Sequence, residues 1–342
     1  MVSVTGSLVK RQLNTASELD GVEAADIVPR MLSPASPKNA LYYPITSSVI
    51  LAAVVLTVMW RSGQDLDDLL MNNLVWQRWE VWRAISSTLL HVNYFHLAFN
   101  VYWIWTFGTL VERVFGHVYC AGIFLLLAFG SMLAEFAVLT GGVGLSGVGY
   151  GLWGMLWVLE KRDARFADAV DSHTSQMFVG WFFLCIILTV TGVMPVANIA
   201  HGVGALMGIL LGFAICGTQA AKRNSTAGLI AIVFLALVGS TVFWPSANFS
   251  QYAESEIERA GLAALDRNDP VRAVKLLESA ARMKHAPARA WYNLGVAYRR
   301  AGRIQDAVLA YEHAGSMPDA DADMRGVAKD LSGFGTLSIT NH

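Results

Sequence analysis

The chain has 342 residues, of which 54% are hydrophobic and only 15% are charged. This composition is typical of a membrane protein over at least part of its length. The formal net charge of −1, with no basic stripe or arginine-rich tail, excludes a nucleic-acid partner. Residues 1–40 hold no apolar core ahead of a cleavage site, so we expect no signal peptide.

Seven stretches are apolar enough, or nearly enough, to cross a bilayer, and each predicts a transmembrane helix. They are residues 43–60, 94–112, 118–138, 146–160, 176–193, 199–217 and 227–244. The fourth is short and the second holds several polar groups, which is typical of helices that line a cavity. The sequence therefore predicts an all-α, polytopic membrane protein.

Lysine and arginine residues are concentrated on one side of these spans. With a cytoplasmic N-terminus, the inner segments carry Lys10, Arg11, Arg30, Lys38, Arg113, Lys161, Arg162, Arg165, Lys222 and Arg223. The short outer loops carry only Arg61, Arg78 and Arg83. The positive-inside rule therefore predicts a cytoplasmic N-terminus, and seven crossings put everything after Trp244 on the outer side.

The loop Trp76-Gln77-Arg78-Trp79-Glu80-Val81-Trp82-Arg83 lies between the first two spans and is rich in tryptophan. Indole rings favour the level of the lipid headgroups, and arginine side chains extend towards water. We therefore expect this loop at the outer membrane interface.

From about Glu254 the sequence changes to alternating charged and Ala/Leu positions, which is typical of soluble amphipathic helices. The 34-residue tetratricopeptide (TPR) pattern is matched by Trp291, Leu294, Gly295, Tyr298, Ala307, Tyr311 and Ala314, with Pro318 one residue from the usual closing proline. A degenerate first repeat is predicted over 254–287, followed by a second repeat and a capping helix at 320–332. An unrelated helical hairpin is the alternative.

Three polar residues of the spans fall at one depth. Because an α-helix rises ~1.5 Å per residue, the distance along each helix to its inner end estimates depth. These distances place Asn100, Ser146 and His201 at ~20, ~22 and ~25 Å above the inner boundary. In a hydrocarbon core of ~30 Å, that layer lies beneath the outer surface, so we expect a site reached from the outer side.

Ser146 begins the fourth span, where the free amides and positive dipole end of a helix favour negative charge. His201 lies near the start of the sixth span. Each helix has a face of small residues that allows close packing in lipid: Gly147, Gly151 and Gly154 beside the serine, and Gly204, Gly208 and Gly212 beside the histidine. We therefore expect the two helices to be neighbours, with His201 in hydrogen-bond reach of Ser146.

His91, His96 and Asn100 form the pattern H-x4-H-x3-N, which puts His96 and Asn100 on one helix face. A zinc site is the alternative interpretation, but the HExxH glutamate and a nearby cysteine or carboxylate ligand are missing from the pattern. Hydrogen-bond donation to a developing oxyanion suits these side chains better. We expect no metal and no cofactor.

In this order, the motifs resemble the rhomboid intramembrane serine proteases over roughly residues 43–217. They are Trp82-Arg83, His91…His96…Asn100, Glu112-x3-Gly116, Gly144-Leu145-Ser146-Gly147 with Tyr150, and Ala200-His201-x2-Gly204-x3-Gly208. The resemblance implies a six-helix core in which Ser146 is the nucleophile and His201 the general base and acid. It also implies an oxyanion hole formed by Asn100, His96 and the Ser146 amide.

Supporting roles follow from the same resemblance for Tyr150, Gly144, Gly147 and His91. The ring of Tyr150 would pack against His201 in place of an orienting carboxylate, and His91 would be structural and hold the loop. Glu112 would be a packing residue, whereas Glu135 receives no role.

The chain is thus divided into a cytoplasmic N-terminal segment (1–42), a protease core (43–217), a loop with a seventh transmembrane helix (218–244), a TPR-like domain (245–332) and a C-terminal tail (333–342). The predicted function is cleavage of transmembrane-protein substrates in or near their membrane-spanning segments, in a bacterial inner membrane. The repeats, on the outer side, would bind a substrate ectodomain or a protein partner. A catalytically silent rhomboid-like scaffold and a transporter are the alternatives.

Overall fold

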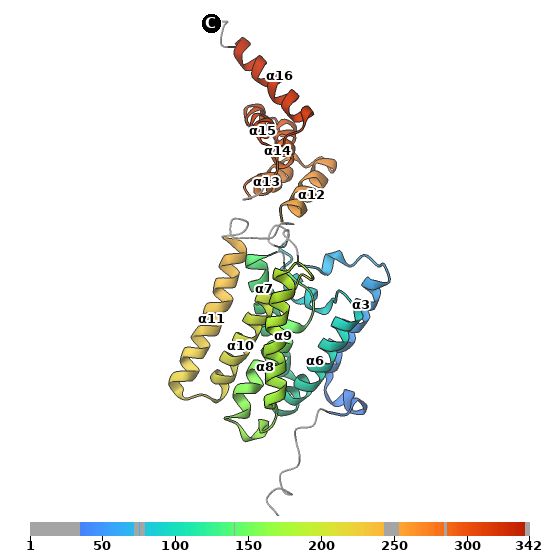
Figure 1. The fold of residues 1–342 in the computed structure, drawn as a ribbon, viewed down its shortest axis with the longest axis vertical. Helices are drawn as coiled ribbons and strands as arrows, with labels where there is room; N and C mark the ends of the chain where they lie inside the picture. Colours follow the sequence, from blue (N-terminus) through green and yellow to red (C-terminus); the bar gives the residue numbers. More distant parts are fainter. Residues whose placement is uncertain are drawn as a thin grey trace, which may run out of the picture.

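The computed structural model describes residues 35–71, 75, 79–139, 141–242, 253–283 and 286–338, so most of the predicted segment 1–42 lies outside it. The regular elements of this part of the chain are all helical, which confirms the all-α class. Seven of these helices pack together as a bundle (Figure 1). They are α3 (Pro44–Arg61), α6 (Tyr94–Phe115), α7 (His117–Val138), α8 (Ser146–Glu160), α9 (Ser172–Val190), α10 (Asn198–Cys216) and α11 (Gln219–Thr241). Short helices lie in the connections: η1 (Pro37–Tyr42), η2 (Asp67–Leu69), α5 (Arg83–Ser86), η3 (Ser87–Leu89) and η4 (Ala164–Phe166).

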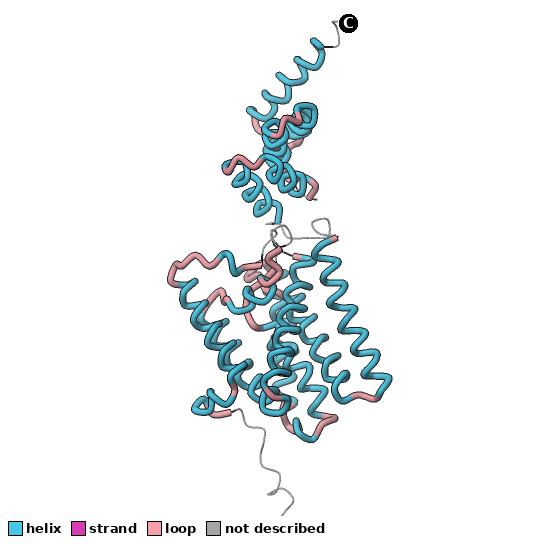
Figure 2. The backbone as a smooth tube through the Cα atoms, turned by 180° about the vertical axis from the view of Figure 1, so that it is seen from behind, coloured by secondary structure: helices cyan, strands magenta, loops and turns pink. Residues whose placement is uncertain are grey.

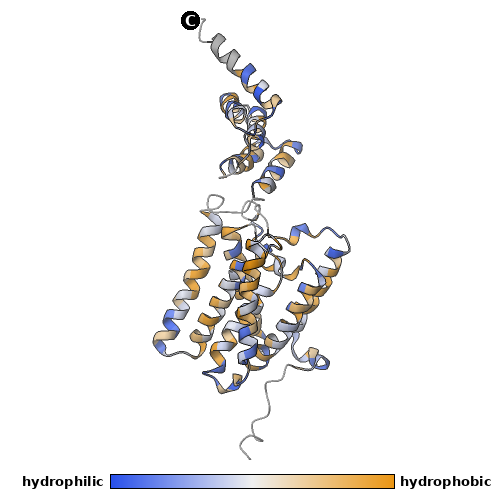
Figure 3. Cartoon of the chain, viewed as in Figure 1, coloured by the Kyte–Doolittle hydropathy of each residue, from blue (hydrophilic) through white to orange (hydrophobic). Residues whose placement is uncertain are grey.

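Within the described residues, five bundle helices are long and apolar enough to cross a membrane, namely α3, α7, α9, α10 and α11. Hydrophobic residues cover most of the length of the bundle (Figure 3). The two remaining helices are α6, which is the span with several polar groups, and α8, which is the short span. Most residues of α8 are buried in the protein. Burial against other helices explains why α8 does not need the length of a lipid-facing span.

Helix α11 begins at Gln219, earlier than the predicted start at residue 227. The Thr218 side chain caps the helix by accepting a hydrogen bond from the Ala221 amide at 3.3 Å. Its first turns carry Lys222 and Arg223, which lower the local hydropathy although the helix is continuous there. Hydropathy therefore marked the apolar part of this helix and missed its polar beginning.

The loop before α6 differs from the sequence expectation in one respect. Trp79 and Trp82 are exposed, as expected for an interface, but Arg83 is only 1% exposed. Its guanidinium bonds the Asp67 and Leu70 carbonyl oxygens and pairs with Asp68 at 2.9 Å and Glu80 at 2.7 Å. The expectation that this arginine extends towards water is therefore wrong, because its loop supplies all of these partners. Residues 76–78 lie outside the described residues.

Helices α8 and α10 are packed through their glycines. A Cβ atom added at Gly204 would overlap the Gly147 carbonyl oxygen, and one added at Gly208 would overlap that of Gly151. The two main chains are therefore in direct contact. This confirms that the small-residue faces of the two helices are neighbours.

Gly208→Ala is expected to destabilise the protein, because the new methyl group meets backbone atoms of α8 and forces the helices apart. Overpacking of this kind costs about 1–3 kcal/mol. We expect a lower Tm than wild type in the same detergent. Gly180→Ala on α9 is the matched control, because nothing lies within 4 Å of its added Cβ. Equal Tm values for the two variants would contradict the close contact.

The C-terminal helices lie beyond one end of the bundle and form two hairpins and a final helix (Figures 1 and 2). The hairpins are α12 (Ala253–Asp266) with α13 (Pro270–Ala281) and α14 (Ala288–Arg300) with α15 (Ile304–Ser316). The last helix, α16 (Ala322–Ser338), extends past the predicted boundary at 332, and residues 339–342 lie outside the described residues.

The two hairpins repeat one packing contact. Gly261 of α12 packs against Leu277, and Gly295 of α14 packs against Tyr311. The two glycines are 34 residues apart (295 − 261), and so are their partners (311 − 277). The hairpins are therefore related by the repeat length that the sequence predicts.

A buried carboxylate joins the two hairpins. Glu258 of α12 is 3% exposed and accepts hydrogen bonds from Arg289 at 2.6 Å and Asn293 at 2.5 Å, both on α14. Burial acts to raise the pKa of Glu258, but the hydrogen bonds from Arg289, Glu254 and Asn293 and the positive charge of Arg289 outweigh it, so the pKa lies below its usual value. The link between hairpins is thus made by an ionised carboxylate.

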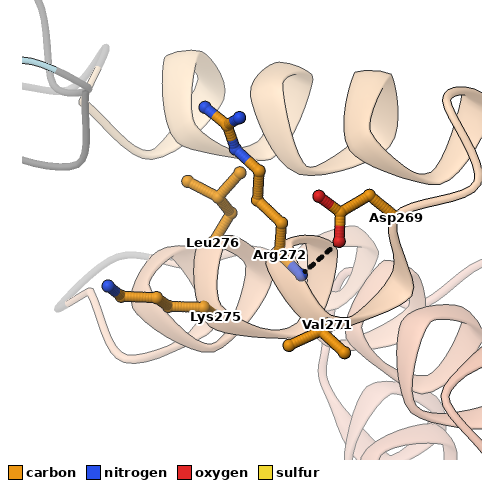
Figure 4. A pocket seen from close by; sticks show the side chains of 5 residues that line it. All are labelled: Asp269, Val271, Arg272, Lys275 and Leu276. Atoms are coloured by element: carbon orange, nitrogen blue, oxygen red, sulfur yellow. Dashed lines mark hydrogen bonds between the residues drawn. The ribbon is translucent and has the colours of Figure 1, made fainter.

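Helix α13 begins with a capping contact shown in Figure 4, in which the Asp269 carboxylate accepts a hydrogen bond from the Arg272 amide at 3.0 Å. An open pocket of about 380 Å³ lies here, lined by Asp269, Val271, Arg272, Lys275 and Leu276. Because its walls come from a short stretch of one helix, the pocket is a surface groove and not an enclosed binding site.

Candidate active site

Ser146 and His201 meet between α8 and α10. Ser146 is the first residue of α8, and His201 lies in the first turn of α10. The Nε2 atom of His201 is 2.7 Å from the Ser146 Oγ atom, although the residues are 55 positions apart in sequence. This is the geometry of a nucleophile paired with a general base.

The His201 ring is held by stacking. It is 4% exposed and lies on the ring of Tyr150, with centroids 4.8 Å apart and planes at 27°. The Tyr150 hydroxyl donates a hydrogen bond to the Phe178 carbonyl oxygen at 3.0 Å. The Nδ1 atom of His201 has no hydrogen-bond partner among the residues that the structure describes. This packing of Tyr150 on His201 agrees with what the family resemblance of the motifs implied.

The loop before Ser146 contacts the side chains of His91 and His96. The Leu145 amide donates a hydrogen bond to His91 Nε2 at 3.3 Å, and the two histidine rings meet edge to face with centroids 4.9 Å apart. Gly144 has φ +105°, and a Cβ atom there would lie 2.5 Å from the His96 ring. Glycine is thus required at 144 by both conformation and space.

Asn100 and His96 lie one turn apart on α6. The Nδ2 atom of Asn100 donates a hydrogen bond to the His96 carbonyl oxygen at 3.0 Å, and the Asn100 side chain is almost fully buried. An amide nitrogen carries two hydrogens, so Asn100 retains a second donor. Gly147, the remaining supporting residue, packs against the Ser131 side chain.

Two residues around the site received no role from the sequence. The hydroxyl of Thr57, on α3, is 3.3 Å from His91 Nδ1 and is fully buried. The carboxylate of Glu135, on α7, contacts the first turn of α10. Their sequence signal was only a polar residue inside an apolar span, which does not say what it contacts.

Comparisons with known proteins cover this part of the chain. Residues 78–218 match the Rhomboid domain family. The Rhomboid protease GlpG of Haemophilus influenzae is 28% identical over 182 residues, which cover 52% of this chain and 94% of that protein. GlpG proteins of Serratia proteamaculans and Pectobacterium atrosepticum are each 29% identical, over 50% of this chain and 62% of each relative.

The matched segment holds α6 to α10 and therefore both Ser146 and His201, whereas the C-terminal helices lie outside it. The family match and the named relatives support the assignment of this chain to the rhomboid family, as an intramembrane serine endopeptidase.

Proposed function

We propose that the chain hydrolyses peptide bonds in or near the transmembrane segments of membrane proteins, with Ser146 and His201 as its catalytic dyad. The observation that carries this proposal is the 2.7 Å contact between His201 Nε2 and Ser146 Oγ. Polar and ionisable side chains are costly within a membrane and mark functional sites there.

In the first half of the reaction, Ser146 Oγ attacks the carbonyl carbon of the scissile bond while His201 Nε2 takes its proton. The tetrahedral oxyanion accepts hydrogen bonds from the Asn100 side chain, the His96 ring and the Ser146 amide. His201 then donates the proton to the leaving amine, which departs and leaves an acyl-enzyme.

In the second half, water attacks the ester carbonyl of the acyl-enzyme, and His201 again removes a proton. A second oxyanion forms in the same place. Its collapse breaks the bond to Ser146 Oγ, which takes the proton back from His201, and releases the new carboxyl end. The estimated depth of the dyad puts it nearer the outer surface, so this water enters from the outer side.

The arrangement in the membrane is part of the proposal. We place the N-terminus in the cytoplasm and let α3 and α6 to α11 make seven crossings of a bacterial inner membrane. The distribution of lysine and arginine supports this orientation. The named relatives are bacterial proteins, which supports the compartment.

We assign the C-terminal helices to a TPR domain on the outer side of the membrane. The repeated glycine contact at a spacing of 34 residues supports the repeat assignment. Stacked helical hairpins present extended surfaces to other polypeptides, so this domain would hold a substrate ectodomain or a protein partner.

The full-length protein, purified in detergent, is expected to cleave a transmembrane reporter equally well with and without EDTA, because the dyad needs no metal. A fluorophosphonate probe is expected to modify Ser146, as located by mass spectrometry of the labelled peptide. Folded protein that neither cleaves nor takes the label would instead favour a scaffold that acts through the TPR domain. Cleavage lost in EDTA would contradict the dyad mechanism.

A further inference from the structure

A fully buried carboxylate on α7 contacts the helix that carries His201. Glu135 is 2% exposed, and its Oε2 atom accepts a hydrogen bond from the Ala200 amide at 2.9 Å. Ala200 directly precedes His201. The carboxylate thus binds the main chain beside the general base and does not contact the imidazole ring in this arrangement.

The first turn of α10 lacks a cap of its own. The helix begins at Asn198, and its N-cap position is occupied by Ala197, which has no side-chain acceptor. The first amides of a helix have no partner within that helix, and such groups are costly away from water. Glu135 supplies the missing acceptor from a neighbouring helix.

The direction of the His201 ring depends on this turn. Among the described residues no side chain bonds His201 Nδ1, so the ring is placed by the main chain of α10 and by stacking on Tyr150. A displacement of the first turn would move Nε2 away from the Ser146 Oγ atom. In a catalytic dyad, a misplacement of 1 Å costs about 100-fold in rate.

We propose that Glu135 is a positioning residue, which acts through the Ala200 amide to hold His201 in line with Ser146. The inference rests on the proposed function, since it assumes that His201 is the general base. The reach of the side chain is what matters, because an acceptor oxygen must arrive at the amide of the residue before the histidine.

Glu112 offers a matched control in the same bundle. It is also 2% exposed, and its carboxylate accepts hydrogen bonds at 2.9 Å from the Ile45 and Thr46 amides at the start of α3. The Glu112 carboxylate also bonds the Thr46 hydroxyl and His117, so its loss removes buried hydrogen bonds from the bundle, but α3 carries neither member of the dyad. A comparison of variants at Glu135 and Glu112 therefore separates an effect on stability from an effect on catalysis.

The test compares kcat, KM and Tm of full-length wild type with Glu135→Leu, Glu135→Gln and Glu112→Leu, using one transmembrane reporter in one detergent, well below each Tm. For Glu135→Leu we expect kcat to fall by about 10- to 100-fold, with KM within about twofold of wild type. Glu135→Gln keeps an acceptor oxygen, so kcat should stay within about threefold. Glu112→Leu should lower Tm while kcat also stays within about threefold.

Wild-type kcat in Glu135→Leu, or an equal fall of kcat in the two leucine variants, would overturn the inference. If Glu135→Leu does not fold, Glu135→Asp replaces it: the shorter side chain retracts the oxygen, so kcat should fall below that of Glu135→Gln, and equal values would overturn the inference. Wild-type protein is assayed for reporter cleavage and Ser146 labelling in the same preparation. Failure of wild type would refute the proposed function, whereas an active wild type with an equally active Glu135→Leu would refute only the role of Glu135.

Discussion

Ser146→Ala is expected to abolish cleavage of a transmembrane reporter, with kcat lower by about 10⁴-fold or more. The alanine methyl group cannot attack a carbonyl carbon, so no acyl-enzyme forms and fluorophosphonate labelling at this position is lost. The fold should persist, because the change removes one hydrogen bond, worth about 1 kcal/mol, from the start of α8. Reporter cleavage on gels, together with Tm, measures both effects.

Ser240→Ala provides the control for this experiment. Ser240 is a fully buried serine of α11, and its hydroxyl donates a hydrogen bond to the Leu237 carbonyl oxygen at 3.0 Å. The same atom is thus removed from the same bundle, on a helix that carries no residue of the proposed site, and cleavage should continue. Cleavage that survives in Ser146→Ala would show that another residue, or a contaminating protease, performs the reaction.

His201→Ala is expected to lower kcat by a similar factor, because Ser146 then has no base to take its proton. The double variant Ser146→Ala/His201→Ala should be no slower than either single variant, since residues that act as one unit are not additive. Initial rates measured over long incubations establish this comparison.

His173→Ala is the matched histidine control, because His173 is exposed near the start of α9. Its activity should equal that of wild type. Independent, multiplying losses at Ser146 and His201 would contradict a dyad, because they would mean that the two side chains contribute to separate steps.

Local signals in the sequence were sufficient to predict much of the fold. Helix α8 begins at Ser146 and ends at Glu160, as the hydropathy predicts. The contact between α8 and α10 followed from glycines spaced on one helix face, because small residues leave only main chain to meet main chain. The hairpin contacts at Gly261 and Gly295 likewise agree with a repeat that is visible in the sequence.

Contacts between distant segments could not be predicted in this way. The bond between Glu135 and Ala200 joins residues 65 positions apart, and a lone carboxylate in an apolar span does not name its partner. Arg83 is a second case, since tryptophan-rich composition indicated an interface while the fold of the loop buried its charge. Both residues are fixed by tertiary structure, which a local pattern does not contain.

The glycine contact between α8 and α10 makes the spacing of Ser146 and His201 a property of the main chain. Side chains between two helices can change rotamer and let the helices slide, but carbonyl oxygens seated against glycine Cα atoms allow no such adjustment. A larger side chain at Gly204 or Gly208 would therefore separate the serine from the histidine without changing either residue.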